Sequence, residues 1–229
     1  MRVKTVIFDL DGTLVSFNLD YKTVRAEVKG YLVKMGVPAS LLSVNESIFE
    51  MLRKTETFVK NSGKLQKVLE EMRSEVLAMA EKYELEAAMC TSLLPGTVET
   101  LKALRRMGLK IGLCTINSEK SMNVILNRFG IADLFDVTVP RNKVNHFKPH
   151  PEHLEVALKA LVASAKDTVV VGDSSTDMQS AKELKAIAVG LPTGVSTIEQ
   201  LTSNGANYII TSITDLPVLI AQINKTQKT

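Results

Sequence analysis

The sequence predicts an α/β protein with a Rossmann-like parallel sheet, in which the first strand is central, and a helical insertion directly after that strand. Short β-branched runs alternate with helical patterns, which is typical of a parallel sheet covered by helices. The stretch from about Asn18 to Cys90 instead has helical spacing and no convincing strand. Acidic or hydroxyl side chains follow three of the strand candidates, at the end of the strand where such sheets bind ligands.

Five strands are predicted from apolar and β-branched runs. They are Val3–Phe8, Lys110–Cys114, Thr168–Val171, Ala186–Val189 and Tyr208–Ile210. Two helical stripes between the later strands end at Gly108 and Gly130, where glycine is favoured as a helix C-cap.

The insertion is predicted to be a four-helix-like unit. Apolar residues recur at helical spacing from Val24 to Leu32 and from Leu65 to Tyr83. Gly36-Val37-Pro38 and Asn61-Ser62-Gly63 are expected to break the helices. The predicted domains are therefore residues 1–16 and 91–229 for the α/β core and residues 17–90 for the insertion.

Composition narrows the class of protein. The chain has 229 residues, 45% of them hydrophobic, which is enough for a sizeable core. A net charge of +3, spread evenly, predicts neither a nucleic-acid partner nor a membrane partner. With no leader expected before the first strand and only two cysteines, Cys90 and Cys114, the sequence favours a reducing cytoplasm. Monomer and homodimer both stay open.

The first strand is followed by two carboxylates, Asp9 and Asp11, two residues apart. Side chains at i and i+2 of an extended segment project to the same side, so both acids are expected to face one point. Gly12 permits a tight turn there. Because two such acids repel each other unless a cation or a shared proton relieves them, the pair suits a nucleophile, an acid/base and a divalent metal. The alternative is a plain Asp-Gly surface turn.

The next two candidates suit an anion. Thr115 ends the second strand candidate, and Asn117 and Ser118 follow it at a helix start, where a hydroxyl and free N–H groups bind anions. These residues could equally be no more than a helix cap. Lys148 precedes Pro149, which disfavours helix at the lysine and predicts a cation fixed in a loop. Its alternative is an ordinary solvated lysine.

A third strand candidate is also followed by acids. Asp173 lies just after the run Val169–Val171, and Asp177 lies four residues further on. Carboxylate oxygens are the ligands that Mg²⁺ prefers. Asp177 could instead be a carboxylate in the first turn of a helix, where negative charge is favoured anyway.

These four motifs, in this order, resemble those of the haloacid dehalogenase-like superfamily of phosphohydrolases. The quoted segments are Phe8-Asp9-Leu10-Asp11-Gly12-Thr13, Ile111-Gly112-Leu113-Cys114-Thr115, Lys148-Pro149-His150-Pro151 and Val171-Gly172-Asp173-Ser174-Ser175-Thr176-Asp177. The insertion resembles the helical cap of the subgroup that contains phosphoglycolate phosphatases and β-phosphoglucomutase. Many phosphatases of that subgroup have Asn directly after the motif Thr, whereas here Ile116 intervenes before Asn117.

The resemblance implies a role for each site residue. Asp9 would be the nucleophile that forms an aspartyl-phosphate, and Asp11 would protonate the leaving oxygen and then activate water. Thr115 and Lys148 would bind the phosphoryl group. Mg²⁺ would be held by Asp9, the backbone carbonyl of Asp11, and Asp173, with Asp177 as a further ligand or as support.

The resemblance therefore implies a Mg²⁺-dependent phosphatase for a small phosphorylated metabolite, such as phosphoglycolate or a sugar phosphate. A phosphomutase is the second enzyme hypothesis, and a phospho-accepting regulatory module is the non-enzyme hypothesis. Asp11 argues against dehalogenation, since the dehalogenases of the superfamily lack this acid. Four basic residues of the insertion have no assigned role, and all three histidines are predicted to be loop or helix-surface residues. These are Arg53, Lys54, Lys60 and Lys64, and His146, His150 and His153.

Overall fold

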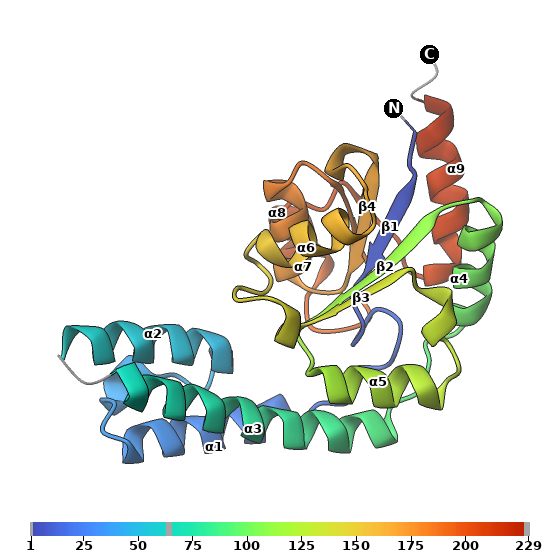
Figure 1. The fold of residues 1–229 in the computed structure, drawn as a ribbon. Coiled ribbons are helices and arrows are strands. Elements are labelled where there is room, and N and C mark those ends of the chain that lie inside the picture. Colours follow the sequence, from blue (N-terminus) through green and yellow to red (C-terminus); the bar gives the residue numbers. More distant parts are fainter. Residues whose placement is uncertain (1, 63–65, 227–229) are drawn as a thin grey trace. The chain divides into compact units, whose positions relative to one another are not determined.

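A computed structural model describes residues 2–62 and 66–226 (Figure 1). Within them, six parallel strands form one sheet in the order β3-β2-β1-β4-β5-β6, which confirms the predicted α/β class and the central first strand. The strands are β1 (Thr5–Phe8), β2 (Lys110–Thr115), β3 (Val137–Pro140), β4 (Thr168–Gly172), β5 (Ile187–Gly190) and β6 (Tyr208–Ile209). The strand order reverses beside β1, so the carboxyl ends of β1 and β4 meet at the position where doubly wound sheets bind ligands.

Helices cover both faces of the sheet. On one face α4 (Thr97–Arg106), α5 (Glu119–Arg128) and α9 (Leu216–Thr226) pack around the inward side chains of β1, such as Phe8. On the other face α6 (Glu152–Ala160), α7 (Ser175–Glu183) and α8 (Ile198–Ser203) pack around Ile7 and its neighbours. Because successive side chains of β1 point to opposite faces, residues 6 and 8 enter one core and residue 7 the other.

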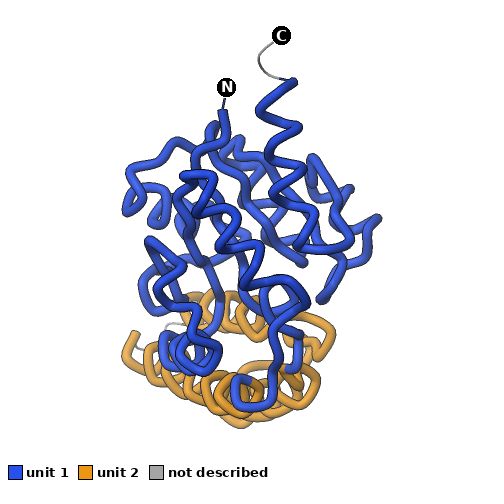
Figure 2. The backbone as a smooth tube through the Cα atoms, turned by 90° about the vertical axis from the view of Figure 1, so that its right-hand side faces the viewer, with its two compact units in different colours: residues 1–18, 88–229 blue, residues 19–87 orange. Residues whose placement is uncertain are grey.

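The chain divides into two compact units, Met1–Asn18 with Ala88–Thr229, and Leu19–Ala87 (Figure 2). The second unit contains α1 (Tyr21–Lys34), α2 (Ile48–Asn61) and α3 (Gln66–Cys90) up to Ala87, with a short 3₁₀ turn at Ala39–Leu41. Its own core includes Val28, Met51 and Met72, all fully buried. The sequence predicted four helices, but the described residues form three, since the apolar stripe after Gln66 continues as one unbroken helix of 25 residues. The predicted positions Gly63 and Leu65 lie outside the described residues.

One strand was missed by the sequence analysis. β3 has only four residues and includes Thr138 and the terminal Pro140, so it lacks a run of apolar residues. It lies at the sheet edge, where proline is tolerated, and pairs with β2 alone. Asp136, just before β3, accepts a hydrogen bond from the backbone N–H of Ile111 (2.7 Å) and aligns the two strands.

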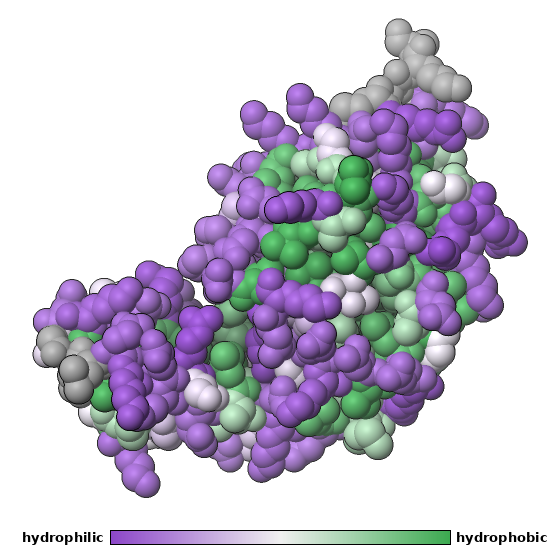
Figure 3. Space-filling view, viewed as in Figure 1, coloured by the Kyte–Doolittle hydropathy of each residue, from purple (hydrophilic) through white to green (hydrophobic). Residues whose placement is uncertain are grey.

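Hydrophilic side chains make up most of the face seen in the space-filling view (Figure 3). In the described part of the chain, no helix combines the length and the apolar character needed to cross a membrane.

Candidate active site

The loop after β1 positions the first two acids. Asp9 is 8% exposed, and its backbone N–H donates to the carbonyl of Val171 on β4 (2.9 Å). Gly12 then takes a φ of +80°, and a Cβ there would lie 2.7 Å from the carboxylate of Asp173. Glycine is therefore required at this position both for the left-handed backbone and for the close approach of a second acid.

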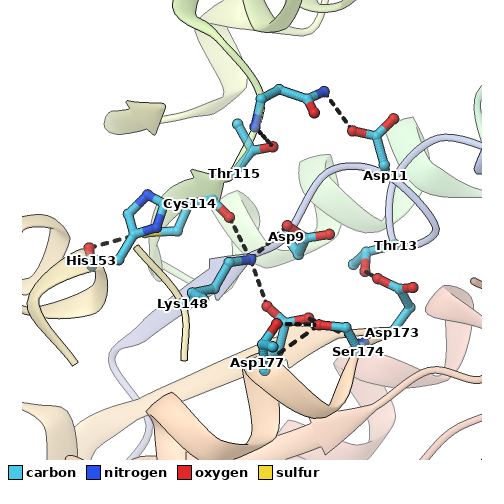
Figure 4. Close-up of polar contacts among 12 residues, drawn as sticks. Asp9, Asp11, Thr13, Cys114, Thr115, Lys148, His153, Asp173, Ser174 and Asp177 are labelled. Carbon is cyan, nitrogen blue, oxygen red and sulfur yellow. Dashed lines mark hydrogen bonds and ion pairs between the residues drawn. The ribbon is translucent and has the colours of Figure 1, made fainter. Parts of the chain in front are cut away.

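The carboxylate of Asp11 is held by a residue from the loop after β2, and the expectation that it faces one point with Asp9 stays a prediction. Its carboxylate oxygen Oδ2 accepts a hydrogen bond from the side-chain amide of Asn117 (2.5 Å), and the two acids lie apart in the close-up (Figure 4). The strand ends at Phe8 and the chain bends at Leu10, between the two acids, so the alternation of a strand does not extend to Asp11. The metal role predicted for Asp11 concerns its backbone carbonyl and stays a prediction.

Lys148 lies between two of the predicted acids. Its ammonium group donates to Asp9 Oδ1 (2.6 Å), Asp177 Oδ1 (2.6 Å) and the carbonyl of Cys114 (2.9 Å), which uses all three of its N–H groups (Figure 4). Burial lowers the pKa of Lys148, but the charges of Asp177 and Asp9 outweigh it, so the net pKa is raised and the lysine stays charged. The solvated-lysine alternative is wrong, since its side chain is 3% exposed.

The pKa of Asp9 is raised to about 6. Burial is the largest cause, and the charge of Lys148 opposes it. Asp9 is therefore mainly ionised at pH 7, and the ionised form is the one in which a carboxylate oxygen is nucleophilic.

Asp173, beyond the end of β4, is held from two directions. Its Oδ1 accepts from the hydroxyl of Thr13 (3.3 Å) and its Oδ2 from the backbone N–H of Val195 (2.8 Å). Burial and the neighbouring charge of Asp9 raise its pKa well above the ordinary value. A Cβ at Gly194 would lie 1.8 Å from Asp173 Oδ2, so the loop after β5 reaches this carboxylate only because residue 194 has no side chain.

Asp177 is both a helix cap and part of the charged cluster. Its Oδ2 accepts from the backbone N–H and the hydroxyl of Ser174 (3.1 and 2.5 Å), which completes a capping box at the start of α7. Its Oδ1 faces Lys148. A Cβ at Gly172 would lie 2.3 Å from the Asp177 carboxyl carbon, so the strand end is also shaped around this acid.

Thr115 lies at the carboxyl end of β2, 1% exposed. Its hydroxyl accepts from the backbone N–H of Asn117 (3.1 Å), while Ser118 caps α5 by accepting from Ser121. Arg141, after β3, donates to the carbonyl of Ile116 (2.9 Å) and fixes the same turn. The helix cap is thus Ser118, and neither Thr115 nor Asn117 is used for it.

The site also includes residues that sequence analysis did not assign. Asn117 was named at the helix start and Thr13 within the first motif, but neither was paired with an acid, and Val195 and Arg141 carried no signal. The contacts of all four cross more than 20 residues of sequence. His153 was predicted on the surface, and this is wrong: it is fully buried. Its Nε2 pairs with the carbonyl of Val139 (2.8 Å).

The acidic cluster fits a divalent metal. Ligand atoms of Asp9, Asp173 and Asp177 all lie within 4.8 Å of one another, and all three residues are buried. Three buried carboxylates against the one charge of Lys148 leave negative charge uncompensated, which favours a bound cation. Oxygen donors alone are the set that Mg²⁺ prefers.

The comparisons with known proteins agree with this geometry. The family model of the haloacid dehalogenase-like hydrolases matches residues 3–185, more than half of the chain. The chain belongs to this family and is a phosphatase-type hydrolase. The resemblance seen in the four motifs is thus confirmed.

Three relatives illustrate the match. The chain is 26% identical over 234 residues to "Pyrophosphatase PpaX" of Bacillus mycoides, covering 98% of this chain and 100% of the relative. A predicted phosphoglycolate phosphatase from Haemophilus somnus has a similar structure (TM-score 0.65, 21% identity, 96% of this chain and 98% of that one). So does a putative β-phosphoglucomutase from Thermotoga maritima (TM-score 0.63, 20% identity, 96% and 100%). The two solved structures support the fold.

Proposed function

We propose that the protein is a Mg²⁺-dependent phosphatase that works through an aspartyl-phosphate on Asp9. The observation that carries this proposal is the buried Asp9 carboxylate at the end of β1, paired on Oδ1 with Lys148 and within metal-sharing distance of two further acids. A carboxylate oxygen of Asp9 attacks phosphorus and the bond to the leaving oxygen breaks. Water then attacks the same phosphorus, which releases inorganic phosphate and restores the carboxylate.

Asp11 is proposed as the acid and base of these two steps. It gives a proton to the leaving oxygen in the first step and takes one from water in the second, which is worth on the order of 10²–10⁴-fold in rate. The contact from Asn117 supports this role, since it fixes the carboxylate of Asp11 in one position in the loop after β1.

Lys148 and Thr115 are proposed to bind the transferring phosphoryl group. The ammonium group of Lys148 contacts the carboxylate of Asp9, to which the phosphoryl group would be transferred. The positive charge of Lys148 therefore lies where negative charge accumulates during the transfer. The Thr115 hydroxyl and the turn before α5 add donors at the neighbouring strand end.

Asp9, Asp173 and the backbone carbonyl of Asp11 are proposed to hold Mg²⁺, which when bound neutralises charge on the phosphoryl oxygens. Asp177 is proposed mainly as support, because each of its oxygens already has a partner, Lys148 on one side and Ser174 on the other.

The substrate is proposed to be a small phosphorylated molecule in the cytoplasm, with the Leu19–Ala87 unit acting as a cap. Pyrophosphate is the first candidate, because full-length curated relatives carry the name pyrophosphatase. Phosphoglycolate and sugar phosphates come next. A mutase remains the alternative, supported by the similarity in fold to a putative β-phosphoglucomutase.

Trapping the intermediate tests the proposal. Acid quenching during turnover of a ³²P-labelled substrate should leave label on the protein, and borohydride reduction of the acyl phosphate should convert residue 9 to homoserine. Asp9→Asn should show no label and no phosphate release while keeping its far-UV circular dichroism spectrum. Label at any residue other than Asp9 would contradict the mechanism.

A substrate panel separates the candidate functions. Phosphate release should be compared for pyrophosphate, phosphoglycolate and several sugar phosphates, and the sugar phosphates should also be checked for isomerised product. Release of phosphate supports a phosphatase, whereas isomerisation without net release supports a mutase. Labelling of Asp9 with no turnover of any substrate would favour a regulatory module.

A further inference from the structure

A second group of metal-ligating side chains lies outside the acidic cluster, in the segment between β3 and α6. His146, His150 and Glu152 bring ligand atoms within 4.8 Å of one another. His146 Nδ1 lies 2.6 Å from Glu152 Oε2, and the two imidazole rings have their centroids 4.7 Å apart. The three residues come from both sides of the Lys148-Pro149 step, so they converge only because the chain turns there.

Backbone contacts hold this arrangement. Glu152 Oε1 accepts from the N–H of Asn145 (2.9 Å), which fixes the carboxylate over the start of the segment. The N–H of Glu152 donates to Nδ1 of His150 (3.2 Å), which fixes the second ring against the start of α6. Two ring nitrogens and a carboxylate oxygen are therefore brought together by contacts within one short stretch of chain.

We propose that His146, His150 and Glu152 form a binding site for Zn²⁺, distinct from the acidic cluster. Two imidazoles and one carboxylate are a donor set found in zinc sites with one position left open to water. Imidazole nitrogens favour Zn²⁺ over Mg²⁺, whereas the all-carboxylate cluster favours Mg²⁺. On binding, Zn²⁺ replaces the hydrogen bond between His146 and Glu152, and the proton of the neutral imidazole stays on the ring nitrogen that does not bind the metal.

Zn²⁺ at this site should stabilise the folded protein. Zn²⁺ would join residues 146 and 150 to residue 152 and so close the segment that carries Lys148. Because the three ligands converge in the folded chain, Zn²⁺ should bind the folded state more tightly than the unfolded state and stabilise it by mass action.

The experiment measures Zn²⁺ binding with excess Mg²⁺ present, so that the acidic cluster is occupied by the competing ion. Titration against a fluorescent zinc chelator gives stoichiometry and affinity for the wild type, His146→Ala, His150→Ala and Glu152→Gln. Glu155→Gln is the matched control, since Glu155 is an exposed acid on the same helix. Far-UV circular dichroism checks that each variant is folded.

Each of the three ligand variants should either bind one Zn²⁺ fewer than the wild type or bind Zn²⁺ at least about tenfold more weakly. The loss of a residue that only hydrogen-bonds to a ligand already weakens metal binding about tenfold or more. Glu155→Gln should bind as the wild type does. Co²⁺ should give a visible absorption band in the wild type that His146→Ala lacks, because imidazole ligands are required for it. Equal Zn²⁺ stoichiometry and affinity in the wild type and both histidine variants would overturn the proposal.

Discussion

At the scale of single residues, the contact between Asn117 and Asp11 is the one that bears most directly on catalysis. Asn117 is 7% exposed, and its side-chain amide donates to the carboxylate of Asp11 in the loop after β1 (2.5 Å). Because a general acid must be held in position to transfer a proton, Asn117 is expected to act on the reaction through Asp11.

Asn117→Ala should lower kcat by roughly tenfold for substrates with poor leaving groups, a fraction of the value of a full acid/base. It should lower kcat much less for p-nitrophenyl phosphate, whose leaving group needs little protonation. Steady-state kinetics with both substrates give the comparison, and Asp11→Asn gives the upper limit of the effect. An equal loss with both substrates would mean that Asn117 acts on phosphate binding and not on Asp11.

The stability of the fold should depend on pH through His153. In the folded state the pKa of His153 is lowered from an ordinary 6.5 to about 4. Burial is the main cause, and the charge of Lys148 adds to it. Its Nδ1 has no hydrogen-bond partner among the described residues, so the ring is neutral with Nε2–H donating to Val139. Between these two pKa values the unfolded chain takes up a proton that the folded chain does not, so stability falls as pH falls from 6.5 toward 4.

From pH 7 to pH 5, this single residue should cost the wild type roughly 2 kcal/mol of unfolding free energy. His153→Gln keeps a donor for the Val139 carbonyl but has no group that titrates. Chemical denaturation at both pH values should therefore show a smaller loss for His153→Gln than for the wild type. Parallel losses in the two proteins would show that His153 titrates normally in the fold.

At the scale of elements, the loop after β5 completes the site. Thr193 donates to the carbonyl of Gly12, Val195 donates to the Asp173 carboxylate, and Ser196 accepts from the N–H of Ser175. This loop thus joins the ends of β1, β4 and α7. Gly194 lies at the centre of these contacts, against Asp173.

Gly194→Ala should raise the Mg²⁺ concentration for half-maximal activity by about tenfold or more, because the new Cβ forces the carboxylate of Asp173 out of place. Loss of the groups that position a metal ligand lowers metal affinity by about 10–100-fold. Gly30→Ala in α1 is the contrasting control. Nothing lies within 4 Å of a Cβ there, so it should raise stability by about 0.5–1 kcal/mol. Kinetics against Mg²⁺ and chemical denaturation check the two variants. An unchanged Mg²⁺ requirement in Gly194→Ala would show that the position of Asp173 does not depend on a glycine at residue 194.

At the scale of the whole molecule, charge in the site is coupled to stability. Asp9, Asp173 and Asp177 bring three carboxylates together with one lysine, so the metal-free protein holds repulsion that a cation relieves. Three basic residues of the second unit have acidic partners within that unit. Arg53, Lys54 and Lys60 pair with Glu50, Glu46 and Glu56 on their own surface, and Lys64 lies outside the described residues.

Mg²⁺ at 100 times its dissociation constant should stabilise the wild type by about 2.7 kcal/mol, and chelator should reverse the gain and abolish activity. Asp173→Asn should be more stable than the wild type in chelator, since it removes a repelling charge, and should gain little from Mg²⁺. Thermal denaturation with and without Mg²⁺ measures both effects. Stabilisation of Asp173→Asn by Mg²⁺ equal to that of the wild type would exclude Asp173 as a ligand.

The sequence alone determined the parallel sheet, the central first strand, and the acids at the ends of β1 and β4. These features follow from local rules: β-branched runs specify the buried strands, and parallel strands bring their carboxyl ends to one edge of the sheet. Asp9 and Asp173 meet because β1 and β4 are neighbours in that sheet. Short β3 escaped prediction because an edge strand needs no long apolar run.

Only the tertiary structure decided how the polar groups pair. Asp11 turns to Asn117, Lys148 bridges Asp9 and Asp177, and His153 is buried although a histidine in the first turn of a surface helix gives no local sign of it. Whether a polar side chain is buried, and which group it pairs with, depends on residues of other elements that enclose it. Periodicity describes one element at a time, whereas hydrogen bonding and burial belong to the packed molecule.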